Sequence, residues 1–147
     1  TEIFSTGSAF AALKVDGSVV TWGNNQVGGS VSSSVSAQLS SGVVEIFSTN
    51  SAFAALKSDG SVITWGASTK GGDSSSVSSD LASGVVDICS TLAAHSGAYA
   101  ALKSDGSVIT WGQSDHGGDS DSVSSSLSSG VISIYSTDSA FAAILEI

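Results

Sequence analysis

Apolar residues in this chain alternate with a period of two over short runs, separated by polar segments that contain glycine. In the run AFAALK, Phe53 and Ala55 fall on one face of an extended chain. Ala52, Ala54 and Leu56 fall on the other face. Both faces are apolar and mostly small, which predicts a strand in a sheet that is covered on both sides.

Two further runs flank this strand. The run Val43–Thr49 (VVEIFST) is rich in β-branched and aromatic residues, as strands prefer, and Ser61–Trp65 (SVITW) is a second such run. Asp59-Gly60 separates AFAALK from SVITW and predicts a two-residue hairpin turn, because Asp and Gly tolerate positive φ angles. The three runs together predict a three-stranded antiparallel sheet.

A polar segment, ASTKGGDSSSVSSDLASG, follows this sheet at positions 67–84. Asp73 or Ser74 is a possible N-cap for a two-turn helix whose apolar positions are Val77 and Leu81, and Gly84 would end it. Serine is a poor helix former, so packing would have to hold the helix. The alternative is an extended loop.

The same pattern occurs three times and begins a fourth. SAFAALKSDGSVITWG at 51–66 and GAYAALKSDGSVITWG at 97–112 are identical at 14 of 16 positions, and the tryptophans are 43 and 46 residues apart. Such a period indicates stacked units. We expect a single repeat domain, 1–147, of about 3.4 units, with approximate bounds 1–42, 43–84, 85–130 and a partial unit at 131–147. The other copies of the first strand are Thr1–Thr6, Val85–Thr91 and Val131–Thr137. The structural signature positions are Trp22, Trp65, Trp111, Gly17, Gly60, Gly106, Leu13, Leu56 and Leu102.

The unit resembles the RCC1-like repeat, named after the regulator of chromosome condensation. The match lies in Ala55-Leu56, Asp59-Gly60 and Trp65-Gly66, and it recurs in the next unit. Gly71-Gly72-Asp73 replaces the usual Gly-Gln-Leu-Gly segment, a serine-rich segment replaces the proline-containing strand, and the repeats are short. The resemblance is therefore to the short RCC1-like arrays of large microbial and algal proteins. It implies an all-β repeat protein with short helices, built from stacked three-stranded blades, either propeller-type or as an open β-solenoid stack.

Propellers usually close with four to eight blades, so about 3.4 units would not close alone. Three arrangements follow: an excerpt of a longer ring, several chains that complete one ring, or an open stack that joins head to tail. The start at Thr1 without Met likewise predicts a processed protein or an excerpt of a longer array.

Charge and composition exclude several partner classes. Four Lys and no Arg stand against thirteen Asp plus Glu, giving a net charge of −9. Binding to nucleic acid or an anionic membrane needs Lys and Arg to replace counterions, so neither partner is expected. No apolar run is long enough to span a membrane, and the lone Cys89 excludes an internal disulfide.

Three lysines share one repeat position, Lys14, Lys57 and Lys103, each two residues before the turn aspartate. They could form a row of ligand-contacting cations, but solvated hairpin ends balanced by acidic neighbours are the preferred interpretation. Asp119 and Asp121 weakly resemble a calcium loop; a polar loop is preferred, because calcium takes six to eight oxygen ligands.

No catalytic set is recognisable, so we expect neither an enzyme nor a cofactor. His95 and His116 are isolated in variable loops, and Cys89 stands where Phe47 stands in the preceding unit, which favours a packing role. The three tryptophans could stack on sugars, but interior packing is preferred.

The leading hypothesis is a non-catalytic structural protein, extracellular or at the cell surface. Its repeats would assemble head to tail into a filament, complete a ring as a homo-oligomer, or belong to a long surface array. The alternative is an RCC1-like propeller that presents variable loops, such as Thr91–Gly97 and Asn24–Gly29, to a protein or glycan.

Overall fold

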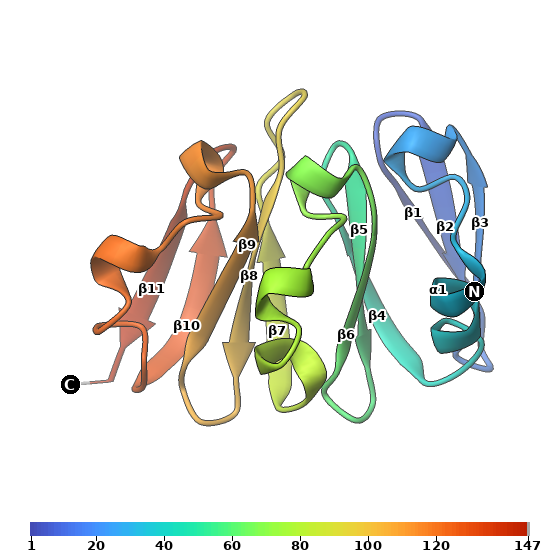
Figure 1. The fold of residues 1–147 in the computed structure, drawn as a ribbon. Helices are drawn as coiled ribbons and strands as arrows, with labels where there is room; N and C mark the ends of the chain where they lie inside the picture. The colour runs from blue at the N-terminus through green and yellow to red at the C-terminus, as the bar shows by residue number, and fades with distance from the viewer. Residues whose placement is uncertain (147) are drawn as a thin grey trace.

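The computed structural model describes residues 1–146, which form four antiparallel sheets stacked side by side (Figure 1). Three sheets have three strands and the last has two. We call them blades 1 to 4. Blade 1 comprises β1 (Glu2–Ser5), β2 (Ala9–Leu13) and β3 (Val19–Gly23). Blade 2 comprises β4 (Val43–Ser48), β5 (Ala52–Lys57) and β6 (Val62–Gly66). Blade 3 comprises β7 (Val85–Ser90), β8 (Ala98–Lys103) and β9 (Val108–Gly112), and blade 4 comprises β10 (Val131–Ser136) and β11 (Phe141–Leu145).

The predicted strands are therefore present, but the hairpin turn between β5 and β6 differs from the prediction. Lys57 and Ser61 form the closing pair, with the Lys57 N–H donating to the Ser61 carbonyl at 2.9 Å, so three residues rather than two form the loop. Gly60 has φ +77°, whereas Asp59 does not have a positive φ. The connection is thus a turn followed by one left-handed glycine, and the two-residue prediction was wrong.

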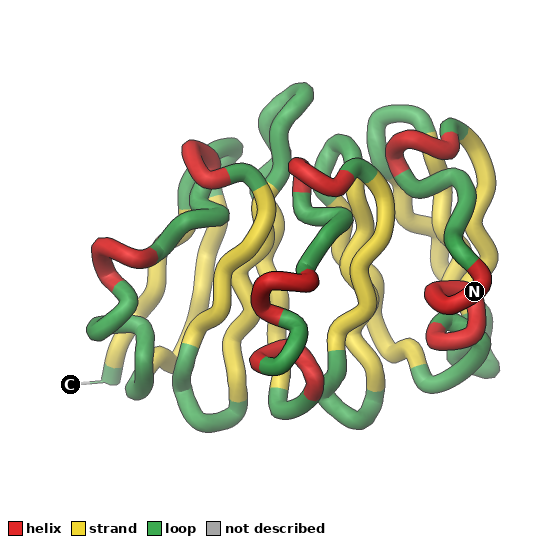
Figure 2. Tube along the Cα trace, viewed as in Figure 1, coloured by secondary structure: helices red, strands yellow, loops and turns green. Residues whose placement is uncertain are grey.

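The polar connecting segments also differ from one unit to the next. The first contains the α-helix α1 (Ser33–Gln38), with the Ser32 hydroxyl accepting from Val35 N–H at 3.3 Å. One-turn 3-10 helices occupy the corresponding places in the later units, at 75–77, 80–82 and 121–123, and others follow the third strands at 25–27, 68–70 and 114–116. The predicted two-turn helix at 74–83 is therefore two separate turns, because serine-rich sequence does not sustain helix propagation. All these turns lie along one side of the stack (Figure 2).

The core lies between the blades, as the doubly apolar strands predicted. Ala52, Ala54 and Leu56 pack toward blade 3 together with Tyr99 and Trp111. The alternate residues of β5 pack toward blade 1, in a second cluster with Trp65 and Leu39. The alanines of β5 are fully buried, which lets neighbouring sheets lie close together.

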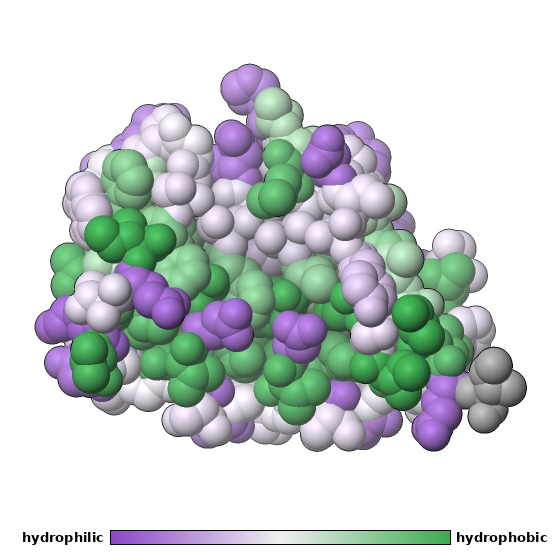
Figure 3. Space-filling view, turned by 180° about the vertical axis from the view of Figure 1, so that it is seen from behind, coloured by the Kyte–Doolittle hydropathy of each residue, from purple (hydrophilic) through white to green (hydrophobic). Residues whose placement is uncertain are grey.

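Backbone hydrogen bonds link each blade to the next. The carbonyl oxygens of the turn glycines Gly17, Gly60 and Gly106 accept from the first N–H of the following blade, each at 3.0 Å. The first strands lie on the side away from the short helices, and there they carry exposed aliphatic residues: Val44, Val86 and Ile132. A rear view shows apolar patches with hydrophilic residues set among them (Figure 3).

Candidate functional site: the open end blades

The internal junctions define how one blade recognises another. The Trp65 Nε1–H donates to the carbonyl oxygen of Gly28 in the preceding unit at 3.3 Å, and Trp111 does the same to Gly71 at 3.1 Å. Each indole stacks on the aromatic residue of the neighbouring strand: the Phe53–Trp65 ring centroids are 5.2 Å apart. These tryptophans are 4% and 3% exposed, so the preferred packing role is confirmed for both.

Within residues 1–146, no other blade covers the same face of blade 1. Ile3, Phe10, Val20 and Trp22 are 63%, 43%, 50% and 43% exposed. The rings of Phe10 and Trp22 stack with centroids 5.4 Å apart, as their counterparts do in the interior. We call these four residues the open face of blade 1. Interior packing was wrong for Trp22 in residues 1–146, where no blade covers its indole.

Blade 4 is open on its outer side. Tyr135 and Ile144 are 56% and 47% exposed, and Ala140 and Ala142 between them are also exposed. We call these four residues the open face of blade 4. Their counterparts in blade 2 pack under blade 3, where Ala52 and Ala54 are 0% exposed.

Two lysines of the row link neighbouring blades, and all three keep an acidic neighbour. Lys57 Nζ donates to the carbonyl oxygen of Gln38 at 2.9 Å, and Lys103 Nζ donates to that of Asp80 at 2.7 Å. Both carbonyls lie in the connecting segment of the preceding unit. The acidic neighbours expected for the row are also present: Lys14 Nζ lies 3.8 Å from Asp16 Oδ2. The hydrogen bonds from Ser61 and Ser107 are the main causes that lower the pKa of Asp59 and Asp105, and the charges of Lys57 and Lys103 add to them.

A buried hydrogen-bond node between blades 2 and 3 escaped the sequence analysis. The Tyr99 hydroxyl donates to the Ala52 carbonyl at 2.7 Å and accepts from Thr49 N–H at 3.1 Å. The Thr49 hydroxyl accepts from Ala52 N–H and donates to the Lys70 carbonyl at 3.3 Å. Burial raises the pKa of Tyr99 well above its usual range, so the phenol stays protonated and able to donate. Two features of the sequence are its signals: a threonine that directly follows every first strand, and a tyrosine where other units have phenylalanine.

The turn aspartates serve the hairpins. Asp59 Oδ1 accepts from the hydroxyl and the backbone N–H of Ser61 at 2.6 and 3.0 Å. The hydroxyl hydrogen bond is the main cause that lowers the pKa of Asp59, and the backbone hydrogen bond adds to it. Asp16 and Asp105 repeat this arrangement in their own hairpins, so these carboxylates stabilise turns.

The candidate calcium residues lie on one exposed loop, where Asp119 Oδ1 accepts from Asp121 N–H at 2.9 Å. Within residues 1–146 no group of three or more His, Cys, Asp or Glu side chains is placed to hold a metal ion. His116 Nδ1 lies 2.8 Å from Asp115 Oδ1, and this contact is the main cause that lowers the pKa of Asp115. His95 lies in a different loop, with φ +64°.

Cys89 is half-buried between blades 3 and 4, where its Sγ donates to the Ile134 carbonyl at 3.4 Å. Burial, reinforced by Asp87, raises the pKa of its thiol, so the thiol is less reactive than a free cysteine. In the described part of the chain, no helix has the length and apolar character needed to cross a membrane.

No family model matches this sequence, and no curated protein matches it. Among solved structures, human WBSCR16, an RCC1-like protein, matches all of this chain with a TM-score of 0.51 and 16% sequence identity. The chain spans 44% of the length of that protein. At this identity the likeness concerns the fold alone. The fold is an all-β RCC1-like stack of blades, as the sequence predicted.

Proposed function

We propose that this chain is a non-catalytic structural protein of the RCC1-like family whose blades join end to end. The open face of blade 1 in one copy binds the open face of blade 4 in another, giving a head-to-tail filament or part of a long cell-surface array. The observation that carries the proposal is the exposed Phe10–Trp22 stack with Ile3 and Val20 beside it.

The internal junctions supply the argument for a blade as the occupant. Phe53 and Trp65, the counterparts of the exposed pair, are 0% and 4% exposed because the preceding blade covers them. In stacked-repeat proteins the neighbouring repeat covers an apolar face of this kind. An apolar end face of this kind marks an interaction site. A contact between two different faces leads to a ring if the rotation closes and to a filament if it does not.

The use of the charged residues supports a structural role. Lys57 and Lys103 bind backbone carbonyls of the preceding unit, and Asp59 holds its own turn. The same residue types therefore repeat the same local task, whereas an active site needs a unique set of groups.

The test is light scattering of the purified chain over a concentration series, followed by negative-stain imaging. We expect a mass that grows above the 14.4 kDa of one chain. Trp22→Gln should hold the chain at the mass of one copy, because it removes the stacked indole from the open face of blade 1. Val15→Gln is the matched control, since Val15 is 93% exposed but is not part of that face.

Circular dichroism establishes that both variants are folded. A wild-type chain that stays at the mass of one copy at every concentration would contradict the proposal. So would Trp22→Gln assembling as the wild type does.

A binding module is the second candidate, and one observation favours it. The loop that follows β7 projects beyond the other loops of the stack (Figure 1), and its Leu92 is 63% exposed. The Ala93 N–H donates to the Asp138 carbonyl at 3.0 Å, which braces the loop against blade 4. In this alternative the blades form a discrete ring, and a protein or glycan ligand protects residues 92–97 from hydrogen exchange.

A further inference from the structure

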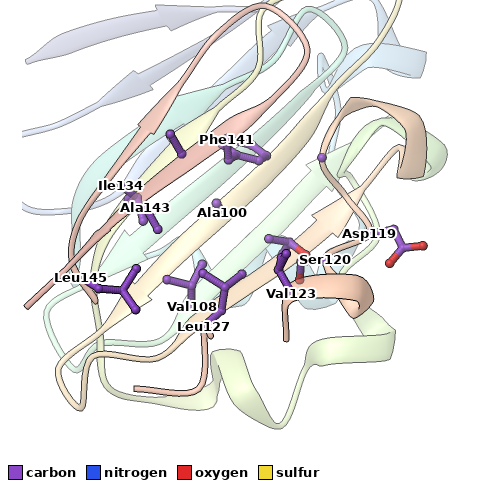
Figure 4. Close-up of a pocket in the computed structure, with 13 residues that line it drawn as sticks. Ala100, Val108, Asp119, Ser120, Val123, Leu127, Ile134, Phe141, Ala143 and Leu145 are labelled. Atoms are coloured by element: carbon purple, nitrogen blue, oxygen red, sulfur yellow. The ribbon is translucent and has the colours of Figure 1, made fainter. Parts of the chain in front are cut away.

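The groove beside β11, between blades 3 and 4, is a second surface distinct from the two open faces. It encloses about 310 Å³. Figure 4 shows Ile134 and Phe141 of blade 4 lining it together with Val108 of blade 3 and with Val123 and Leu127 of the connecting segment. In residues 1–146, blade 4 has two strands, and this groove lies where the third strand lies in the other blades.

The other junctions show what this groove lacks. Leu39 and Leu81, the counterparts of Leu127, are each 1% exposed because a third strand covers them, whereas Leu127 is only half-buried. Val123 is 49% exposed, while its counterpart Val77 packs against the core cluster that contains Trp111.

The polar partners of a third strand are also in place. Gly28 and Gly71 are buried and each accepts an indole N–H, and the equivalent residue in this groove is Gly117, which lines it and is partly exposed. Phe141 corresponds to Phe53, which carries a stacked tryptophan. One edge of β11 pairs with β10, and the opposite edge corresponds to the edge of β5 that binds β6.

We propose that this groove binds an extended strand of the pattern Ile/Val-Thr-Trp-Gly by antiparallel addition to β11. The aliphatic residue and the tryptophan point into the groove, and the indole N–H donates to the Gly117 carbonyl. The glycine is required because Gly66 and Gly112, which follow the internal tryptophans, have φ +111° and +106°. A Cβ at Gly66 would lie 2.7 Å from Ala52 Cα. Strand addition of this kind takes affinity from main-chain hydrogen bonds and specificity from side-chain pockets.

The test uses the chain's own third-strand sequence as the probe. A fluorescein-labelled peptide SVITWGQS, copied from residues 107–114, is titrated with the intact chain and followed by fluorescence anisotropy. We expect saturable binding. Replacing its tryptophan by alanine, or its glycine by valine, should weaken binding by about tenfold or more, since a buried aromatic anchor dominates such interfaces.

Two protein variants locate the site. Val123→Lys puts a charge into the groove and should weaken binding by about tenfold or more, because an unpaired charge is costly to bury. Ile132→Lys is the control, because Ile132 is an aliphatic residue of blade 4 that is 58% exposed and lies outside the groove, and this variant should leave binding unchanged. Trp22→Gln should also leave it unchanged, so that failure of self-assembly and failure of strand binding are told apart.

Three results would overturn the inference: no binding of SVITWGQS to the folded wild-type chain, equal binding of the alanine peptide, or equal binding by the Val123→Lys and Ile132→Lys variants. The peptide comparison uses the wild-type chain and is therefore independent of how well either variant folds.

Discussion

Glycine has two separate roles near the junctions between blades, and these can be measured apart at Gly60, on a hairpin tip, and at Gly130, which directly precedes β10. Gly60 has φ +77°, which side chains rarely tolerate, and a Cβ on it would lie 2.7 Å from the Gly84 nitrogen of the next blade. Gly130 has nearly the same φ, +76°, but a Cβ on it would meet nothing within 4 Å. The positive φ alone therefore explains why position 130 is glycine. Position 60 must be glycine for a second reason, because the backbone of Gly84 lies too close for a Cβ.

We predict that Gly130→Ala destabilises the chain by about 1–2 kcal/mol, the general cost of a left-handed conformation for an L-residue. Gly60→Ala should cost clearly more, because the junction to blade 3 must shift as well. Urea unfolding of both variants measures the difference. An equal loss in the free energy of unfolding for the two variants would mean that crowding between a Cβ at position 60 and Gly84 does not contribute to the destabilisation.

Among residues at the same place on a strand, the position of the blade in the stack determines how much a side chain contributes to the free energy of unfolding. Leu56 on β5 and Ile144 on β11 occupy the same repeat position and are both aliphatic. Leu56 is 6% exposed beneath blade 3, whereas Ile144 is 47% exposed on the open face of blade 4.

Leu56→Ala should therefore lower the free energy of unfolding by about 2–5 kcal/mol, as a cavity opens between two blades. Ile144→Ala should cost below about 1 kcal/mol in the same chemical denaturation series, because surface truncations rarely cost more. A Leu56→Ala cost as small as that of Ile144→Ala would remove Leu56 from the core between blades 2 and 3.

The strands were predictable from sequence, and much of the junction chemistry was not. Alternating apolar residues and the AFAALK pattern predicted doubly covered sheets, because burial follows from side-chain type. The short helices were predicted, but the turn type and the two-turn helix in the segment 67–84 were wrong, since they depend on a single φ angle and on packing against the next unit. The Lys57–Gln38 and Tyr99–Ala52 hydrogen bonds join residues 19 and 47 positions apart, a separation that no local pattern encodes.

Equivalent residues also diverge according to their place in the whole molecule. Trp22 and Trp65 lie in nearly identical sequence, yet one is exposed and the other is buried. Sequence alone treats them alike, because only the number and order of blades decides which faces are covered. The count of about 3.4 units predicted an open stack, whereas the side chains that make up the open faces and the groove of blade 4 became visible only in the structure.

Acidic residues on the first strands of three neighbouring blades, Glu2, Glu45 and Asp87, lie close enough to repel one another. Burial raises the pKa of Glu45, and repulsion from Asp87 and then Glu2, on the neighbouring first strands, raises it further. A folded-state pKa above the unfolded value means that the ionised carboxylate costs stability at neutral pH. That cost disappears as pH falls below the unfolded pKa.

Glu45→Gln should therefore raise the urea midpoint at about pH 7 and change it little at about pH 3.5. Asp138→Asn, which removes a charge on an exposed turn away from this row, is the control and should leave both midpoints unchanged. An equal gain for Glu45→Gln at both pH values would show that the repulsion is not its cause.

The link between each turn glycine and the first N–H of the following blade has a consequence for how such a chain changes over generations. All three junctions use this link, so one recombination event that duplicates or deletes a whole unit leaves the link in place at the remaining junctions. The longer interval of 46 residues between Trp65 and Trp111 is taken up in the loop at 92–97, outside those links. Copy number is therefore the property of this molecule that mutation can alter in a single step, whereas a new contact between blades requires matched changes in two units.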